Sequence, residues 1–210
     1  MLSVFKNLFK AKDRNDFITI VSGLPRSGTS MMMRMLEAGG MEIVTDTMRK
    51  ADEDNPRGYY EDERVKKMKE DASWLDGCQG KVVKVISMLL YDLPTHLKYK
   101  VIFMRREMKE ILASQRVMLR RRGQKEDDAP DEEMAEKFEK HLRQIEGWMA
   151  NQEYMDVLYV TYNEVINDVR NQVKIVDDFL GKRLNEEEMV KAVEKSLYRQ
   201  KKAEDGEKLV

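Results

Sequence analysis

The chain has 210 residues, of which 37% are charged, and its 38 basic and 39 acidic side chains give a net charge of −1. This length predicts one domain, residues 1–210, with a sizeable core, and the balanced charge argues against binding of nucleic acid. The single cysteine, Cys78, excludes an internal disulfide and suits a reducing compartment, so we expect a cytoplasmic protein. No apolar run has membrane-spanning length, so we expect no stable membrane insertion.

In chain order, short apolar runs alternate with longer amphipathic segments. Residues 1–14 are predicted to form a helical extension, 41–60 a loop and 122–133 a charged connector. Strands are predicted at 17–21, 81–86, 101–104 and 157–161. Helices are predicted at 29–37, 61–75, 107–121 and 134–149. Two more are predicted after the last strand, one that ends at Gly181 and one that begins at about residue 185. This alternation predicts an α/β fold of three layers, with a parallel sheet flanked by helices.

The run S-G-L-P-R-S-G-T-S at residues 22–30 follows the first predicted strand and opens a helix. The spacing of Gly23 and Gly28 fits a Walker A loop, but the next two residues are Thr and Ser instead of Lys and Ser or Thr. The cation of the loop is Arg26. The arrangement of strand, loop and helix predicts phosphate binding by backbone N–H groups, and the missing lysine favours a nucleotide handled differently from ATP with Mg²⁺. The alternative is a glycine-rich turn without a ligand.

Four segments in a fixed order resemble sulfotransferases that use 3′-phosphoadenosine-5′-phosphosulfate (PAPS). They are L-P-R-S-G-T-S at 24–30, G-K-V-V-K-V at 80–85, V-I-F-M-R-R-E-M-K-E-I-L-A-S at 101–114 and V-L-Y-V-T-Y-N-E-V-I at 157–166. D-N-P-R-G-Y-Y-E at 54–61 is similar to a stretch in bacterial members. The resemblance implies the P-loop NTPase-like fold of that family. It also implies transfer of a sulfuryl group to a hydroxyl or amine acceptor, with release of adenosine 3′,5′-bisphosphate (PAP) and no metal.

The resemblance also implies roles for particular residues. The 5′-phosphosulfate would be bound by the loop residues Pro25, Arg26, Ser27, Gly28, Thr29 and Ser30. Arg106 and Ser114 would hold the 3′-phosphate, with Arg105 as an alternative to its neighbour. Tyr162 would lie near the adenine. Lys84 and Arg26 would stabilise the charge that develops on the bridging oxygen as it leaves.

For the general base, the sequence departs from the family pattern. The resemblance implies a histidine two residues after Lys84, where this chain has Ile86. The two histidines present are His96, in a predicted loop, and His141, which we expect to be exposed on a helix. Carboxylates are the better candidates, and they are Asp46, Glu61 and, less favoured, Asp54.

Two other functions fit parts of the sequence. A P-loop kinase or NTPase would use ATP with Mg²⁺, but the strand at 101–104 ends in two arginines and not in the aspartate of a Walker B strand. A non-catalytic nucleotide binder would keep the loop and lack turnover, and the missing histidine is consistent with it. The partners predicted from the sequence are therefore a nucleotide and an unidentified acceptor.

Overall fold

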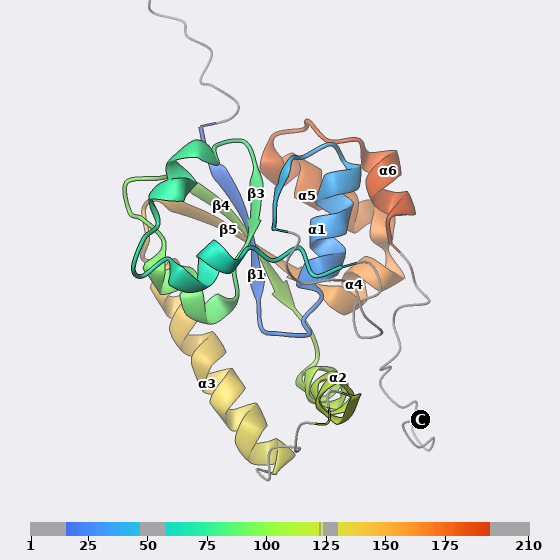
Figure 1. Ribbon diagram of the computed structural model, residues 1–210. Coiled ribbons are helices and arrows are strands. Elements are labelled where there is room, and N and C mark those ends of the chain that lie inside the picture. Colours follow the sequence, from blue (N-terminus) through green and yellow to red (C-terminus); the bar gives the residue numbers. More distant parts are fainter. Residues whose placement is uncertain (1–15, 47–57, 122, 124–129, 194–210) are drawn as a thin grey trace, which may run out of the picture.

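Five parallel strands form one sheet in the order β2-β3-β1-β4-β5, as shown in Figure 1. The computed structural model describes residues 16–46, 58–121, 123 and 130–193. The strands are β1 (Ile18–Gly23), β2 (Ile43–Val44), β3 (Val82–Lys84), β4 (Tyr99–Arg105) and β5 (Met155–Thr161). Because every pairing is parallel, the carboxyl ends of all five strands meet at one edge of the sheet.

Helices cover both faces of this sheet, so the predicted α/β fold of three layers is confirmed. The α-helices are α1 (Thr29–Ala38), α2 (Met108–Arg121), α3 (Asp131–Met149), α4 (Tyr162–Asn167), α5 (Val169–Leu180) and α6 (Glu186–Lys191). The 3-10 helices are η1 (Glu63–Lys67), η2 (Ser73–Gly77) and η3 (Ser87–Asp92). In Figure 1, α2 and the first half of α3 extend beyond the carboxyl edge of the sheet. Among the described residues, no helix combines the length and the apolar character needed to cross a bilayer.

Two apolar clusters, one on each face, hold the sheet between the helices. Side chains of α1, α4, α5 and α6 pack on one face, and those of η1, η2, η3 and the end of α3 pack on the other. Every residue of β1 is buried, as expected for a central strand covered on both faces. The methionines of α1 fill the first cluster, where a flexible thioether adapts to irregular gaps. This rigid core fixes the strand ends from which the site is built.

The sequence prediction differs from the structure between residues 41 and 75. The predicted loop 41–60 contains the short strand β2, and the predicted helix 61–75 is wrong, because it is two 3-10 helices with a turn between them. At that turn, the carboxylate of Asp71 accepts hydrogen bonds from the N–H and the hydroxyl of Ser73. Such local side-chain bonds compete with helical ones, so the apolar spacing persists without a continuous helix.

The predicted connector 122–133 also ends earlier than expected, because α3 begins at Asp131. Three acidic residues form the first turn of α3, where the helix dipole favours negative charge. The four predicted strands are confirmed, with ends that differ by at most two residues. The predicted helical extension, 1–14, lies outside the described residues.

Candidate nucleotide and catalytic site

Four segments that are far apart in the sequence meet at the carboxyl edge of the sheet. The loop 24–28 follows β1, Lys84 ends β3, and β4 and β5 lead into Arg106 and Tyr162. Since β1 lies between β3 and β4, its loop occupies the centre of this edge. Open parallel sheets bind their ligands at the carboxyl ends of the strands. The fold therefore brings together residues that the sequence offered separately.

The loop between β1 and α1 is a compact turn that ends at an uncapped helix start. The N–H of Ser27 donates to the carbonyl of Leu24 at 3.1 Å, and the carbonyl of Gly28 accepts from Met31 and Met32. Within α1 no side chain caps the start and the first turn holds no acidic residue. N–H groups in the first turn of a helix lack partners inside the helix and attract anions. The start of α1 has the geometry of an anion site.

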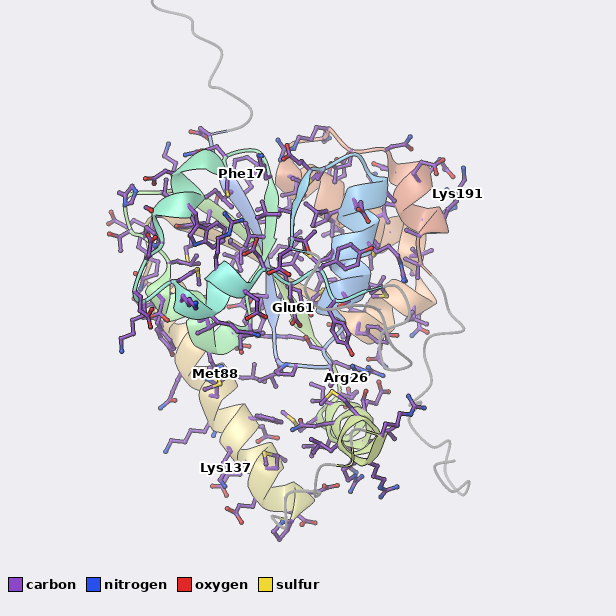
Figure 2. All side chains as sticks on the ribbon, viewed as in Figure 1. Phe17, Arg26, Glu61, Met88, Lys137 and Lys191 are labelled. Carbon is purple, nitrogen blue, oxygen red and sulfur yellow. The ribbon has the colours of Figure 1, made fainter. Side chains whose placement is uncertain are left out.

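Arg26 is turned from the loop toward α2. Its Nε donates to the hydroxyl of Ser114 at 2.9 Å. Figure 2 shows Arg26 between the end of the sheet and α2. Its backbone is left-handed, with φ of 71°, a conformation that is uncommon outside glycine. The loop cation thus contacts the serine that was expected to bind the other phosphate, so the two predicted phosphate positions are adjacent.

The structure distinguishes between the two arginines at the end of β4. Arg106 is largely buried, and its Nη1 donates to the carbonyl of Arg26 at 3.2 Å. Arg105 points to the other side and pairs with Glu146 of α3 at 2.7 Å. Successive residues at a strand end face opposite sides, so only one of two neighbours faces the loop. Arg106 is that residue, and Arg105 is not at the site.

Tyr162, the first residue of α4, closes one side of the loop. The guanidinium carbon of Arg106 lies 4.3 Å from the centre of its ring. Burial raises the pKa of the Tyr162 phenol, and the nearby charge of Arg106 partly opposes this shift. The phenol therefore stays neutral at physiological pH and offers a flat, largely apolar surface. This suits a residue predicted to lie near an adenine ring.

Replacing Gly28 with alanine is expected to lower the free energy of unfolding. The strain of a left-handed residue other than glycine usually costs about 1–3 kcal/mol, and a clash with Tyr162 would add to this loss. Gly28 has φ of 103°, and a Cβ there would lie 2.4 Å from Cδ2 of Tyr162. Chemical denaturation measures the loss. Gly40→Ala is the matched control, because Gly40 has φ of 98° and open space where its Cβ would be. Equal losses for both variants would contradict a role for the Tyr162 contact.

Lys84 reaches the start of α1 from the neighbouring strand. It is buried, with an exposed fraction of 8%, and its Nζ donates to the hydroxyl of Ser30 at 3.1 Å. The same Nζ donates to the carbonyl of Tyr59 at 2.7 Å and lies 3.7 Å from a carboxylate oxygen of Glu61. A cation thus stands beside the anion site, although the loop lacks the Walker lysine. A buried charge acts strongly on a neighbouring one because little water screens it.

The two carboxylates that the sequence offered as bases make different contacts. Glu61 is partly exposed and faces Lys84, and in Figure 2 it lies above Arg26 near the end of the sheet. Asp46 accepts the N–H of Glu63 at 2.6 Å, so its Oδ2 holds the start of η1. One backbone bond, from the N–H of Asp46 to the carbonyl of Glu61, joins the two segments. Of the two carboxylates, Glu61 has an oxygen 3.7 Å from Nζ of Lys84.

The histidines make contacts that do not involve the loop. His141 was expected to be exposed, and this prediction is wrong: it is half-buried and its Nε2 lies 2.8 Å from the hydroxyl of Ser87. Burial lowers the pKa of His141. His96 lies 2.9 Å from Asp76 on the surface. Ile86, at the position where the resemblance implies a histidine, is 38% exposed. The third candidate base, Asp54, lies outside the described residues.

Comparison with known proteins decides the family. The sequence model for the sulfotransferase domain matches residues 16–209, which is most of the chain. The chain belongs to the sulfotransferase family. Recognition of that family from the four segments is therefore confirmed.

Individual sulfotransferases match this chain more distantly. Sulfotransferase 2B1 of the mouse is 29% identical over 113 residues, a match that covers 50% of this chain and 33% of the mouse protein. The rat protein of the same name is 28% identical over 113 residues, with the same coverage. The match thus spans about a third of the length of these curated relatives. The crystal structure of mouse sulfotransferase SULT7A1 complexed with PAP has a TM-score of 0.54 at 16% identity. The structural alignment covers 92% of this chain and 70% of the SULT7A1 chain. This similarity confirms the sulfotransferase fold.

Several contacts of this candidate site were missed in the sequence. Glu110 and Asn163 lie beside Arg106 and Tyr162, and the carbonyl of Tyr59 holds Lys84. A charge four residues after Arg106 on one helix is a signal for Glu110 that the sequence did contain. The contact of Asn163 depends on how β4 pairs with β5, and no local pattern encodes it.

Proposed function

We propose that this chain transfers a sulfuryl group from PAPS to a hydroxyl or amine acceptor. The observation that carries the proposal is the contact between the two predicted phosphate sites, in which Arg106 donates to the backbone of Arg26 and Arg26 donates to Ser114. A nucleotide with phosphates at both the 5′ and the 3′ positions suits two adjacent basic sites. A kinase site would need only the first.

The residues of the loop would bind the 5′ end of the nucleotide. The N–H groups at the start of α1, which no side chain caps, would bind an anion, and Ser27, Thr29 and Ser30 would add hydroxyl donors. The hydroxyl of Ser27 is buried and has no hydrogen-bond partner among the described residues. Buried hydroxyls usually have a partner, so this donor is consistent with a ligand oxygen in the loop.

Lys84 and Arg26 would stabilise the leaving group. In the transfer, a bond forms between the acceptor oxygen or nitrogen and sulfur, while the bond from sulfur to the bridging oxygen breaks. Negative charge then develops on that oxygen. Preorganised cations aimed at such a charge lower the barrier without reorganising during the reaction. Lys84 is held in place by Ser30 and by the carbonyl of Tyr59, as this role requires.

We assign the general base to Glu61 in preference to Asp46. A base must lie within reach of the proton of the acceptor. The acceptor and the leaving oxygen lie on opposite sides of one sulfur atom, so the base is expected close to the cation that stabilises the leaving oxygen. Glu61 lies 3.7 Å from Lys84, whereas an oxygen of Asp46 is occupied by the backbone of Glu63. The proton of the acceptor would pass to the Glu61 carboxylate. A cytoplasmic location is part of the proposal, and the buried thiol of Cys78 is compatible with it.

Nucleotide binding tests this proposal directly. A thermal-shift titration should show stabilisation by PAP without a metal, and weaker stabilisation by ADP or by ATP with Mg²⁺, because a ligand stabilises the state that binds it. A shift only with ATP and Mg²⁺ would replace the proposal with a kinase or NTPase. Binding of PAP without turnover on a broad acceptor panel would support a non-catalytic binder.

Arg106→Lys is expected to weaken PAP binding by about tenfold or more, since lysine cannot grip a phosphate through two parallel hydrogen bonds. This variant keeps a positive charge opposite Glu110, which protects the fold. Arg105→Lys is the matched control, because Arg105 pairs with Glu146 away from the loop. Calorimetric titration measures both. Equal effects at the two positions would contradict the assignment of Arg106.

A further inference from the structure

Glu110 is a buried acidic residue next to the predicted 3′-phosphate site. It lies in the first turn of α2 and has an exposed fraction of 3%. Its Oε2 accepts a hydrogen bond from Nε of Arg106 at 2.8 Å. Its Oε1 accepts one from Nδ2 of Asn163, in α4, at 3.1 Å. A buried carboxylate is retained at a cost in desolvation, so its contacts need a reason.

Both oxygens of Glu110 are needed for these contacts. Arg106 and Asn163 each present a donor, and a carboxylate offers one acceptor oxygen to each of them. A glutamine of the same size has a single acceptor oxygen, and its amide nitrogen would face a second donor. The site is therefore built for a carboxylate and not only for a polar side chain of this length.

The contacts of Arg106 fix its guanidinium in one orientation. Glu110 holds the Nε edge, the carbonyl of Arg26 accepts from Nη1, and the ring of Tyr162 lies against the guanidinium face. A phosphate is bound most specifically across a pair of parallel guanidinium N–H groups. With Nε held by Glu110 and Nη1 by the carbonyl of Arg26, the guanidinium would meet a phosphate in one fixed orientation.

The same carboxylate joins three parts of the chain. Glu110 belongs to α2, Asn163 to α4, and Arg106 to the loop between β4 and α2. Through Arg106 the chain of contacts reaches the backbone of the phosphate loop at Arg26. The orientation of Arg106, the position of Tyr162 and the shape of the loop are therefore linked through one side chain.

We infer that Glu110 is a positioning residue that gives the site its preference for a nucleotide with a 3′-phosphate. The inference rests on the proposed function, because it assumes that Arg106 binds that phosphate. In this role Glu110 would act through Arg106 and not through a contact of its own with the nucleotide. Glu110 orients the guanidinium of Arg106 toward the phosphate. This orientation outweighs the repulsion between the Glu110 carboxylate and the phosphate, because Arg106 and Asn163 both donate to the carboxylate oxygens.

The experiment compares two ligands that differ only in the 3′-phosphate. Dissociation constants for PAP and for adenosine 5′-monophosphate are measured by calorimetry on the wild type and on Glu110→Gln. In the variant, PAP affinity should fall by about tenfold or more, because the charge-assisted bond to Arg106 is lost or shared. Affinity for adenosine 5′-monophosphate should change by less than about threefold, since loop contacts to the 5′-phosphate remain. If Glu110 has a purely structural role, its replacement should lower the affinity for both ligands by the same factor.

The controls separate the possible failures. Glu107→Gln removes an equal charge from the same end of α2 at an exposed position, and it should leave the preference for PAP unchanged. Glu110→Asp keeps the charge but is too short for both contacts, so it should also lose preference, and it replaces the glutamine variant if that one fails to fold. An unchanged or higher preference for PAP in both Glu110 variants would overturn the inference while the proposed function stands. A wild type with no preference for PAP would overturn the proposed function itself.

Discussion

Replacing Lys84 with methionine is expected to lower kcat by about 10²–10³-fold, the usual loss when one group that stabilises a developing charge is removed. Methionine keeps most of the buried volume and removes only the ammonium group. The affinity for PAP should change little, because the N–H groups of the loop and Arg106 remain. The measurement is the release of inorganic sulfate from PAPS with no acceptor present, which follows departure of the leaving group without knowledge of the acceptor.

Lys81→Met is the matched control for this variant. Lys81 directly precedes β3 and pairs with Glu42 at the surface, far from the carboxyl edge. Its loss should leave sulfate release and nucleotide affinity as in the wild type. If Lys84→Met releases sulfate at the wild-type rate, Lys84 is a structural bridge between β3, Ser30 and Tyr59, and the leaving group depends on Arg26 alone.

Glu61→Gln is expected to lower kcat for an alcohol acceptor by about 10²–10⁴-fold, the usual contribution of a general base. The effect should depend on the acceptor. An aliphatic alcohol needs a base to remove its proton, whereas an acidic phenol that is already ionised does not. We therefore expect a large loss with an alcohol found in an acceptor screen and a small loss with the ionised phenol. Steady-state rates on the two acceptors measure this difference.

Two variants in the same region test this assignment. Glu63→Gln changes a carboxylate two residues away that pairs with Lys66, and it should leave both rates unchanged. Asp46→Asn should destabilise η1 by weakening the bond to the N–H of Glu63, with equal effects on both acceptors. An acceptor-dependent loss in Asp46→Asn, without one in Glu61→Gln, would move the base to Asp46.

The sequence predicted the parts of the site that are local in the chain. The phosphate loop is a continuous run between a buried strand and a helix, so its structure follows from neighbouring residues. Arg106 and Lys84 were found through the resemblance of the segments 101–114 and 80–85 to PAPS-dependent sulfotransferases. Register was the weak point, since the sequence could not choose between Arg105 and Arg106. The structure resolves it through alternation along β4, which turns Arg105 toward Glu146.

The missed features depend on tertiary contacts. Glu110 meets Asn163 only because β4 and β5 pair with Arg105 opposite Thr161. His141 looked like a surface residue among charged neighbours, and only the packing of α3 against η3 brings it to Ser87. The error at 61–75 has another origin. The spacing of apolar residues fitted a helix, but the side chain of Asp71 bonds to Ser73 and interrupts it. Periodicity alone does not detect this competition.

The bond between Lys84 and the carbonyl of Tyr59 constrains how this protein can evolve. Tyr59 lies two residues before Glu61, so the proposed base and the carbonyl that holds Lys84 share one short piece of backbone. A single insertion there would displace both groups at once. New acceptors are therefore expected to be acquired through substitutions in other loops, while residues 59–61 keep their length and path. Laboratory selection for new acceptors should therefore yield substitutions in other loops and no insertions or deletions at residues 59–61.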